Sequence, residues 1–205
     1  MVVQAIMIAI IDYGMGNLRS IYNALMNVNG DPVIVSDSAK LSGADAVVIP
    51  GVGSFGDGMN NLKPFADELF DLIHDGIPML GICIGMHVLF DWGEESNCAG
   101  FGLITGDVIR LPQGVRVPQM GWNELQIRCD SDLLSGINDG DFFYFVHSYY
   151  CVPANKHTIT ATTDYGVDLA AVVEKDNIHA VQFHPEKSSS KGLVILKNFV
   201  EMTKC

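Results

Sequence analysis

The sequence of 205 residues has no run of lysine or arginine, and its 12 basic residues stand against 24 acidic ones, for a net charge of −12. This balance makes nucleic acid and anionic membranes poor partners, because both attract positively charged surfaces. No apolar segment approaches the length of a membrane-spanning helix. We therefore expect a function that involves neither nucleic acid nor a membrane.

Cysteine is scarce and irregularly placed. The odd number and the absence of C-x-x-C spacing disfavour a disulfide framework and a zinc site; the cysteines are Cys83, Cys98, Cys129, Cys151 and Cys205. Walker and HExxH motifs are also absent. We expect no metal and no cofactor, and a reducing cytoplasm as the natural setting for a free Cys83.

The apolar residues 2–11 lack the basic region and the small-residue cleavage site of a signal peptide, and they run into Asp12-Tyr13-Gly14. We expect a first buried strand there. Hydrophobic residues make up 48% of the chain, enough for a sizeable core. Because no linker, internal repeat or low-complexity segment divides the chain, one domain over residues 1–205 is the better interpretation.

Strand and helix patterns alternate in the first half. Asn17 is a candidate N-cap for one helix, and Pro64 is expected to kink or start another near residues 58–75. Strands are expected at residues 5–11, 32–35, 46–49 and 77–82, and a further helix at 85–92. The alternation predicts an α/β fold, in which helices flank a mostly parallel sheet and the site lies at the carboxyl ends of the strands.

The second half has a different pattern of short strands separated by turn-forming residues such as Tyr165-Gly166. Strands are expected at residues 103–111, 123–128, 142–146, 158–163, 169–174 and 178–183, and a closing helix at 191–202. We interpret these strands as an antiparallel addition to the parallel sheet.

Cys83, within GICIGMH, follows a predicted strand and precedes a predicted helix. Gly81 and Gly85 leave room for a strained bend like the nucleophile elbow of hydrolases. A sulfur close to the start of a helix also favours thiolate over thiol. Taken alone, Cys83 fits a buried core residue equally well.

His184 and Glu186, within QFHPEKS, supply the partners that a nucleophilic cysteine needs. Residues i and i+2 of an extended chain point to the same side, so the carboxylate would orient the imidazole. Together with Cys83 they predict a nucleophile, a base and an acid that orients the base. This combination makes an inert cysteine a poor explanation.

Attack of a thiolate on an amide also needs hydrogen-bond donors for the developing oxyanion. The backbone N–H of Ile84 is one candidate, and the segment Pro50-Gly51-Val52-Gly53 is another, because glycine permits a reoriented peptide. Taken alone, PGVG is more often an ordinary loop, as is His147-Ser148-Tyr149, and Trp122 is more often a core residue. DYGMGN is rejected as a dinucleotide loop, because Arg19 stands at the place of the third glycine.

Six segments carry a resemblance to a known family: DYGMGNLRSI, PGVGSFGDGM, GICIGMHVLF, VPQMGWNEL, FYFVHSYY and VQFHPEKS. They occur in this order over residues 12–190, nearly the whole chain. The elbow and HPE segments resemble the class I glutamine amidotransferases, whose fold is flavodoxin-like. PQMGWN and FVHSYY narrow the resemblance to the glutaminase subunits of imidazole glycerol phosphate synthase.

The resemblance implies that Cys83 attacks the side-chain amide of glutamine, while His184 acts as base and then as acid and Glu186 orients it. Ammonia then passes through a channel to a (β/α)₈-barrel synthase (cyclase) subunit in a heterodimer. That subunit makes imidazole glycerol phosphate and aminoimidazole carboxamide ribonucleotide in histidine biosynthesis. The resemblance also implies that glutaminase activity stays low until the synthase is bound with its ligand.

The same resemblance assigns two further groups of residues. The residues implied to bind glutamine or its oxyanion are Gly51, Val52, Gly53, Ile84, His87, Ser148 and Tyr149. The residues implied to lie toward the barrel partner are Asn17, Met120, Trp122 and Tyr144.

His87 departs from the family, which usually has Gln at this position to help bind glutamine. Imidazole can still donate one hydrogen bond but lacks the paired carbonyl and amide. We therefore expect functional glutamine binding with altered affinity or pH dependence. The departure also keeps open a paralogue that supplies ammonia to another pathway, such as surface-sugar amination, and a silent regulatory subunit. A cysteine peptidase of related fold is disfavoured by the HPE and PQMGWN segments.

Overall fold

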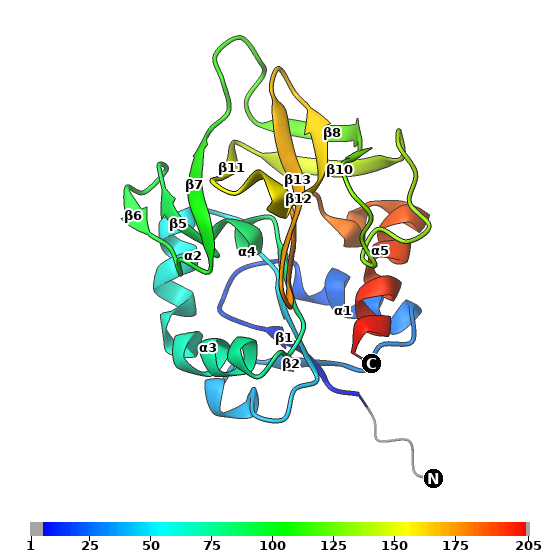
Figure 1. Cartoon of the computed structure of the whole chain (residues 1–205). Coiled ribbons are helices and arrows are strands. Elements are labelled where there is room, and N and C mark those ends of the chain that lie inside the picture. Colours follow the sequence, from blue (N-terminus) through cyan, green and yellow to red (C-terminus); the bar gives the residue numbers. More distant parts are fainter. Residues whose placement is uncertain (1–5, 204–205) are drawn as a thin grey trace.

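The structure is a computed structural model that describes residues 6–203, and an eight-stranded sheet forms its centre (Figure 1). The sheet begins with parallel strands in the order β2 (Pro32–Val35), β1 (Ile8–Ile11), β3 (Ala46–Ile49), β4 (Met79–Ile82) and β14 (Ile178–Val181). It continues with antiparallel pairs through β13 (Asp168–Lys175), β12 (Ile159–Asp164) and β9 (Gln126–Ile127). The predicted fold class is confirmed.

Strands β1, β3 and β4 are buried along their whole length, which explains why their sequences are continuous apolar runs. The first strand starts later than expected, at Ile8, and the predicted residue 5 lies outside the described residues. Strands β2 and β3 have the bounds that the sequence predicted.

Helices cover the parallel part of the sheet on both sides (Figure 1). Helices α1 (Leu18–Asn27) and α5 (Ser189–Met202) pack together on one side. Helices α2 (Phe55–Leu62) and α3 (Ala66–His74) lie on the other. Asn17 caps α1 as predicted, because its side-chain oxygen accepts a hydrogen bond from the Ser20 N–H at 3.3 Å.

The predicted helix at 58–75 is two helices joined by a 3₁₀ turn at Lys63–Phe65. The first helix starts earlier than expected because Ser54 is its N-cap and accepts a hydrogen bond from the Asp57 N–H at 3.2 Å. Pro64 lies in the 3₁₀ turn, so the expected interruption at this proline is confirmed.

The predicted helix at 85–92 is wrong over most of its length. Helix α4 spans only Ile84–His87, and the chain then enters strand β5 (Phe90–Gly93). Residues Met86 to Phe90 are fully or almost fully buried on every side. Such a run has no hydrophobic period that distinguishes a buried helix from a strand.

Two smaller sheets carry the remaining strands. One has the order β11 (Tyr149–Pro153), β7 (Ile104–Arg110), β5, β6 (Cys98–Ala99), and the other pairs β10 (Phe142–His147) with β8 (Gln119–Glu124). The predicted strand at 123–128 is wrong as a single element, because it joins the end of β8 to β9 across the buried Leu125. Strands β5, β6 and β11 were not predicted.

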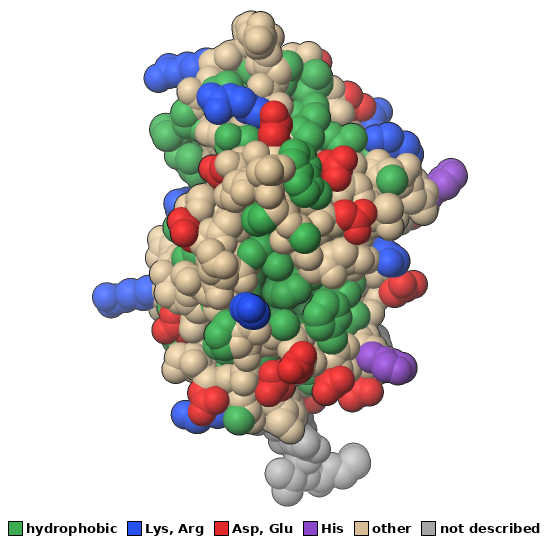
Figure 2. Space-filling view, turned by 90° about the vertical axis from the view of Figure 1, so that its left-hand side faces the viewer, with side chains coloured by type: hydrophobic (Ala, Val, Ile, Leu, Met, Phe, Trp, Pro, Cys, Tyr) green, Lys and Arg blue, Asp and Glu red, His purple; other side chains and the backbone are tan. Residues whose placement is uncertain are grey.

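No helix within residues 6–203 is long and apolar enough to cross a bilayer. The side of the molecule with α2 and α3 has hydrophobic side chains among charged ones, and acidic side chains gather toward its lower end (Figure 2). Phe70 of α3 is among the exposed hydrophobic residues and contacts Phe101 edge to face.

Candidate active site

Cys83 occupies a strained bend between β4 and α4. Its φ of 54° and ψ of −107° are unusual for a residue with a side chain, and such strain concentrates at functional sites. A Cβ on Gly81 would lie 2.5 Å from the Gly85 carbonyl oxygen, and one on Gly85 only 1.8 Å from that of Ile49. Both glycines are therefore required by the bend, as the elbow pattern predicted.

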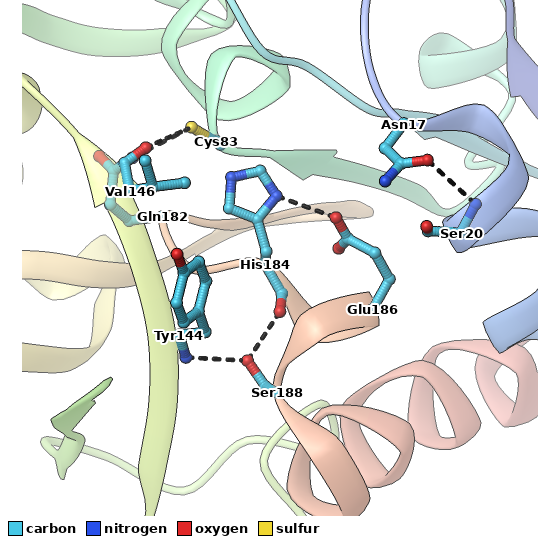
Figure 3. Close-up of polar contacts among 9 residues, drawn as sticks. All are labelled: Asn17, Ser20, Cys83, Tyr144, Val146, Gln182, His184, Glu186 and Ser188. Atoms are coloured by element: carbon cyan, nitrogen blue, oxygen red, sulfur yellow. Dashed lines mark hydrogen bonds and ion pairs between the residues drawn. The ribbon is translucent and has the colours of Figure 1, made fainter. Parts of the chain in front are cut away.

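Strand β14 ends at Val181, two residues earlier than predicted, and His184 follows after Gln182 and Phe183. The side chains of His184 and Glu186 are almost fully buried (Figure 3). The His184 Nδ1–H donates to Glu186 Oε1 at 3.0 Å. The route to this contact differs from the expectation: His184 is extended, but Glu186 lies in a 3₁₀ turn, Pro185–Lys187. The two-residue spacing still brings the imidazole and the carboxylate together, but a turn does this rather than the alternation of side chains along a strand.

Ser188 holds the backbone of this segment and was missed by the sequence analysis. Its hydroxyl donates to the His184 carbonyl oxygen at 2.7 Å and accepts from the Tyr144 N–H at 3.0 Å (Figure 3). The His184 N–H in turn donates to the Tyr144 carbonyl oxygen at 2.9 Å. Strand β10 therefore fixes the position of the imidazole.

His184 is held in its charged form. Burial alone lowers its pKa, but contacts with the Cys83 sulfur and the Glu186 carboxylate outweigh burial and raise it to about 9. Figure 3 shows the other ring nitrogen turned toward Cys83, and this Nε2 atom has no hydrogen-bond partner among the described residues. An imidazolium with a free Nε2–H beside a sulfur can stabilise a thiolate and donate a proton.

A cavity of about 260 Å³ opens beside Cys83. It brings together most residues implied to bind glutamine, namely Val52, Gly53, Ile84, His87, Ser148 and Tyr149. Gly51 lies outside this lining and borders a small recess behind His184 with Asn17. The cavity also contains Glu95, Pro118 and His147, which the sequence analysis did not assign to it.

His87 is buried, and its Nε2–H donates to Gln182 Oε1 at 2.8 Å. Gln182 Nε2 lies 3.8 Å from the Cys83 sulfur, an arrangement that fixes the orientation of the amide. Burial lowers the pKa of His87 to about 4, although the hydrogen bond that His87 donates to Gln182 opposes this shift, so the ring is neutral at physiological pH. The single donor that we expected to face glutamine is therefore engaged by Gln182.

His147 is a second neutral imidazole at the cavity. It ends strand β10 rather than lying in a loop, and its Nδ1–H donates to the Tyr149 carbonyl oxygen at 2.8 Å. Burial is the main cause that lowers its pKa to about 3, and the positive charges that His87 and His184 can carry lower it further. Among the three imidazoles near Cys83, only His184 is thus charged at neutral pH.

Of the residues implied to face a partner, Met120, Trp122 and Tyr144 lie on β8 and β10 outside the lining of this cavity, whereas Asn17 borders the recess behind His184. Met120 and Trp122 of β8 are 66% and 53% exposed, so the interpretation of Trp122 as a core residue is wrong. Trp122 meets the Tyr144 ring edge to face at 6.0 Å, and the Lys187 ammonium lies 6.0 Å from the centre of the same ring. Tyr144 connects this surface to the site through its backbone contacts with His184.

Residues 6–203 contain no group of three or more potential ligands that could hold a metal ion. The site itself has a buried sulfur on an elbow, an imidazolium beside it and a cavity of about 260 Å³, and this combination supports nucleophilic chemistry.

The family described as "Glutamine amidotransferase class-I" matches residues 9–202 of the sequence. The imidazole glycerol phosphate synthase subunit HisH of Methanothermobacter thermautotrophicus is 54% identical over 96% of this chain and 98% of that protein. The subunit of the same name from Methanocaldococcus jannaschii is 44% identical over 96% of this chain and all of its own length.

Among solved structures, PurLQS from Thermotoga maritima matches 97% of this chain and 99% of its own with a TM-score of 0.79 at 19% identity. A glutamine amidotransferase from Thermotoga maritima matches 98% of this chain and 83% of its own, with a TM-score of 0.65 at 16% identity. At such identities these likenesses establish the fold.

Proposed function

We propose that this chain, which belongs to the glutamine amidotransferase class-I family and within it to the HisH subunits of imidazole glycerol phosphate synthase, hydrolyses glutamine to glutamate and ammonia. The ammonia serves a (β/α)₈-barrel cyclase subunit in a heterodimer, which makes imidazole glycerol phosphate and aminoimidazole carboxamide ribonucleotide in histidine biosynthesis. The cytoplasm suits this reaction, because Cys83, Cys98, Cys129 and Cys151 are free thiols.

One observation supports this activity above the others: Cys83, at φ 54°, lies beside a charged His184 that Glu186 orients. This is the arrangement that a thiolate nucleophile with its own proton donor requires. The cavity beside Cys83 offers space for the glutamine side chain to approach the sulfur.

In the first half of the reaction, the Cys83 thiolate attacks the carbonyl carbon of the glutamine carboxamide, and a C–S bond forms. The Ile84 N–H and a peptide N–H of the segment 50–53 stabilise the negatively charged oxygen. His184 then gives its Nε2 proton to the amide nitrogen as the C–N bond breaks. Ammonia leaves, and a glutamyl thioester remains on Cys83.

In the second half, the now neutral His184 accepts a proton from water at Nε2, and the water oxygen attacks the thioester carbonyl. The C–S bond breaks and glutamate forms. The thiolate of Cys83 and the imidazolium of His184 are restored together, so the pair begins the next cycle in the same charge state.

Residues of the cavity wall bind the remainder of glutamine. Ser148 and Tyr149 supply polar groups at the junction of β10 and β11. The Glu95 carboxylate is anchored by the Phe55 N–H at 2.7 Å and can pair with the α-ammonium group of the substrate. The barrel subunit binds at Met120, Trp122 and Tyr144 and also at Asn17, which borders the recess behind His184.

The decisive experiment replaces Cys83 with alanine and measures glutamate release with and without the barrel subunit. We expect a loss of about 10⁴-fold or more, because loss of a triad nucleophile has effects of this size. The complex should still use added ammonium salt, since only nitrogen release is removed. Cys129→Ala is the matched control, because Cys129 is an exposed thiol outside the cavity.

Glutamate release by Cys83→Ala at the wild-type rate would refute the proposed chemistry. If the wild-type chain released no glutamate in either condition, it would be a silent subunit instead. Normal glutaminase activity with a partner other than the histidine-pathway cyclase would favour a paralogue.

A further inference from the structure

In the loop between β1 and α1, residues 12–17 with sequence DYGMGN, the proposed function assigns a role to Asn17 but none to Tyr13. Its Tyr13 side chain is 5% exposed and points into the molecule. The Tyr13 hydroxyl donates to the Pro50 carbonyl oxygen at 2.5 Å. A loop at one strand end therefore contacts the segment 50–53 at the neighbouring strand end, because β1 and β3 run parallel.

Close approaches fix this segment from two sides. A Cβ on Gly16, which has a φ of 98°, would lie 3.1 Å from Pro50 Cβ. A Cβ on Gly51 would lie 2.6 Å from Ile84 Cβ and 2.9 Å from the Tyr13 hydroxyl. The Pro50–Gly51 peptide is thus held between the Tyr13 loop and the first residue of α4, directly after Cys83.

The hydrogen bond from Tyr13 determines how this peptide is rotated. In a trans peptide the C=O and N–H groups point in opposite directions, so a carbonyl held by Tyr13 directs the Gly51 N–H away from it. Val52 and Gly53 follow and line the cavity beside Cys83, and Gly53 has a φ of 118°. A segment with two glycines has many conformations, and one fixed carbonyl removes a large share of them.

We propose that Tyr13 is a positioning residue that orients the peptide N–H groups of residues 51–53 toward the oxyanion formed at Cys83. The inference rests on the proposed function, in which this segment supplies an oxyanion donor. Burial first, and then the charge of the Cys83 sulfur, raise the pKa of the Tyr13 hydroxyl, so it keeps its proton at every physiological pH. The hydroxyl is accordingly a permanent donor.

The test is Tyr13→Phe, studied in the complex with the barrel subunit. The readouts are kcat and KM for glutamine and the inhibition constant of glutamate γ-semialdehyde. The Cys83 sulfur attacks the aldehyde carbon of this inhibitor, and a tetrahedral adduct forms. Loss of a whole oxyanion donor costs about 10²–10³-fold in kcat, and a misoriented donor costs less, so we expect about a tenfold fall in kcat. The inhibition constant should rise by the same factor, while KM stays within about twofold.

Tyr165→Phe, measured with saturating barrel subunit, is the matched control, because the Tyr165 hydroxyl also donates to a backbone carbonyl, that of Arg116, at 2.8 Å and Tyr165 does not line the cavity beside Cys83. It should leave all three values unchanged. A second variant carries 4-fluorophenylalanine at position 13, which fills the space of the hydroxyl without its proton. It should reproduce the losses of Tyr13→Phe even if the phenylalanine protein folds poorly.

Wild-type kcat and aldehyde inhibition in the fluorinated variant would overturn the inference. Equal losses in kcat and substrate affinity would do the same, because they indicate a general structural role. Neither outcome touches the proposed function, which fails only if the wild-type complex releases no glutamate or if Cys83→Ala remains active.

Discussion

At the scale of single residues, three imidazoles lie near the Cys83 sulfur, and their surroundings give them different protonation states. His87 and His147 are neutral because burial opposes their charged forms more strongly than any partner favours them. His184 is equally enclosed, yet the Cys83 sulfur and the Glu186 carboxylate reverse the effect of burial. Only His184 therefore carries a proton that can be transferred to the nitrogen of the leaving ammonia.

The pH dependence of the reaction should report this proton. The wild-type kcat should fall above about pH 9, where His184 loses the proton that it gives to ammonia. Glu186→Gln removes a charge that raises the pKa of His184, so the alkaline fall should move to lower pH. The measurement is kcat of the complex between pH 6 and 10, with Asp168→Asn as control, because Asp168 belongs to an exposed ion pair with Arg128.

The stability of the folded chain should also decrease at alkaline pH, because it depends on the same raised pKa of His184. The pKa of His184 is about 9 in the folded chain and 6.5 for the unperturbed group. The stabilisation from its charged form is therefore complete below pH 6.5 and is lost as the pH rises through 9.

The kcat measurement also tests the assignment of His184 as the proton donor. An alkaline fall in kcat at the same pH in wild type and Glu186→Gln would contradict this assignment.

His87 allows a sharper prediction than the sequence did. His87→Gln should lower the glutamine KM by about two- to tenfold, because a second amide N–H becomes free for the substrate while the first still reaches Gln182. With a pKa of about 4, His87 does not titrate between pH 6 and 8, so the pH dependence in this range should be the same in both proteins.

The matched control is His157→Gln, since His157 is exposed on a 3₁₀ turn. An unchanged KM in His87→Gln, or a pH dependence of KM that only the wild type shows, would contradict the arrangement of His87 and Gln182. The KM should be measured for the complex with the barrel subunit at several pH values.

Whether a residue of the candidate site could be predicted from the sequence depends on whether a local pattern or a contact with a distant segment places it there. Cys83, His184 and Glu186 could be proposed from sequence because local patterns with required glycines and a two-residue spacing define them. Glu95 could not, because it has no motif and its carboxylate is held by the N–H of Phe55, which is 40 residues away in the sequence. His147 and Ser188 depend in the same way on contacts made by β10.

At the scale of elements, the parallel half of the fold was predictable and the second half less so. Strands β2 and β3 have the predicted bounds because polar or turn-forming residues bracket short apolar runs. The stretch after Cys83 gave no such boundary, since burial on every side removes the periodic signal. Strand β11 follows β10 after the single residue Ser148, and the segment His147-Ser148-Tyr149 that joins the two strands was interpreted as a loop.

Local capping explains where α1 and α2 begin, although the sequence analysis identified only Asn17 as a cap. Asn17 and Ser54 each accept a hydrogen bond from a backbone N–H in the first turn of their helix. Both caps follow the ends of parallel strands, so they also set the position of the loops that approach Cys83. The cap of α1 and the contact of Tyr13 belong to one loop.

At the scale of the whole molecule, one strand links the cavity to the exposed surface. Strand β10 holds His184 through Tyr144 and ends at His147 in the cavity, while its partner β8 exposes Met120 and Trp122. A protein bound to β8 would press on the strand that positions the imidazole. This arrangement gives a physical route by which a bound synthase can alter glutaminase activity.

Trp122→Ala tests this surface. Trp122 is 53% exposed and packs on Tyr144, and aromatic anchors of this kind contribute about 2 kcal/mol or more to an interface. We expect the dissociation constant of the complex with the barrel subunit to rise by about 30-fold. The glutaminase activity at saturating partner should change far less, because Trp122 does not line the cavity beside Cys83.

Phe70→Ala is the control, since Phe70 is also an exposed aromatic residue but lies on α3 and contacts Phe101. It should leave the dissociation constant unchanged, as measured by titration calorimetry with the purified barrel subunit. Equal affinities for wild type and Trp122→Ala would move the interface away from β8. A loss with Phe70→Ala alone would place the interface on the side of α2 and α3 and would remove the route through β10.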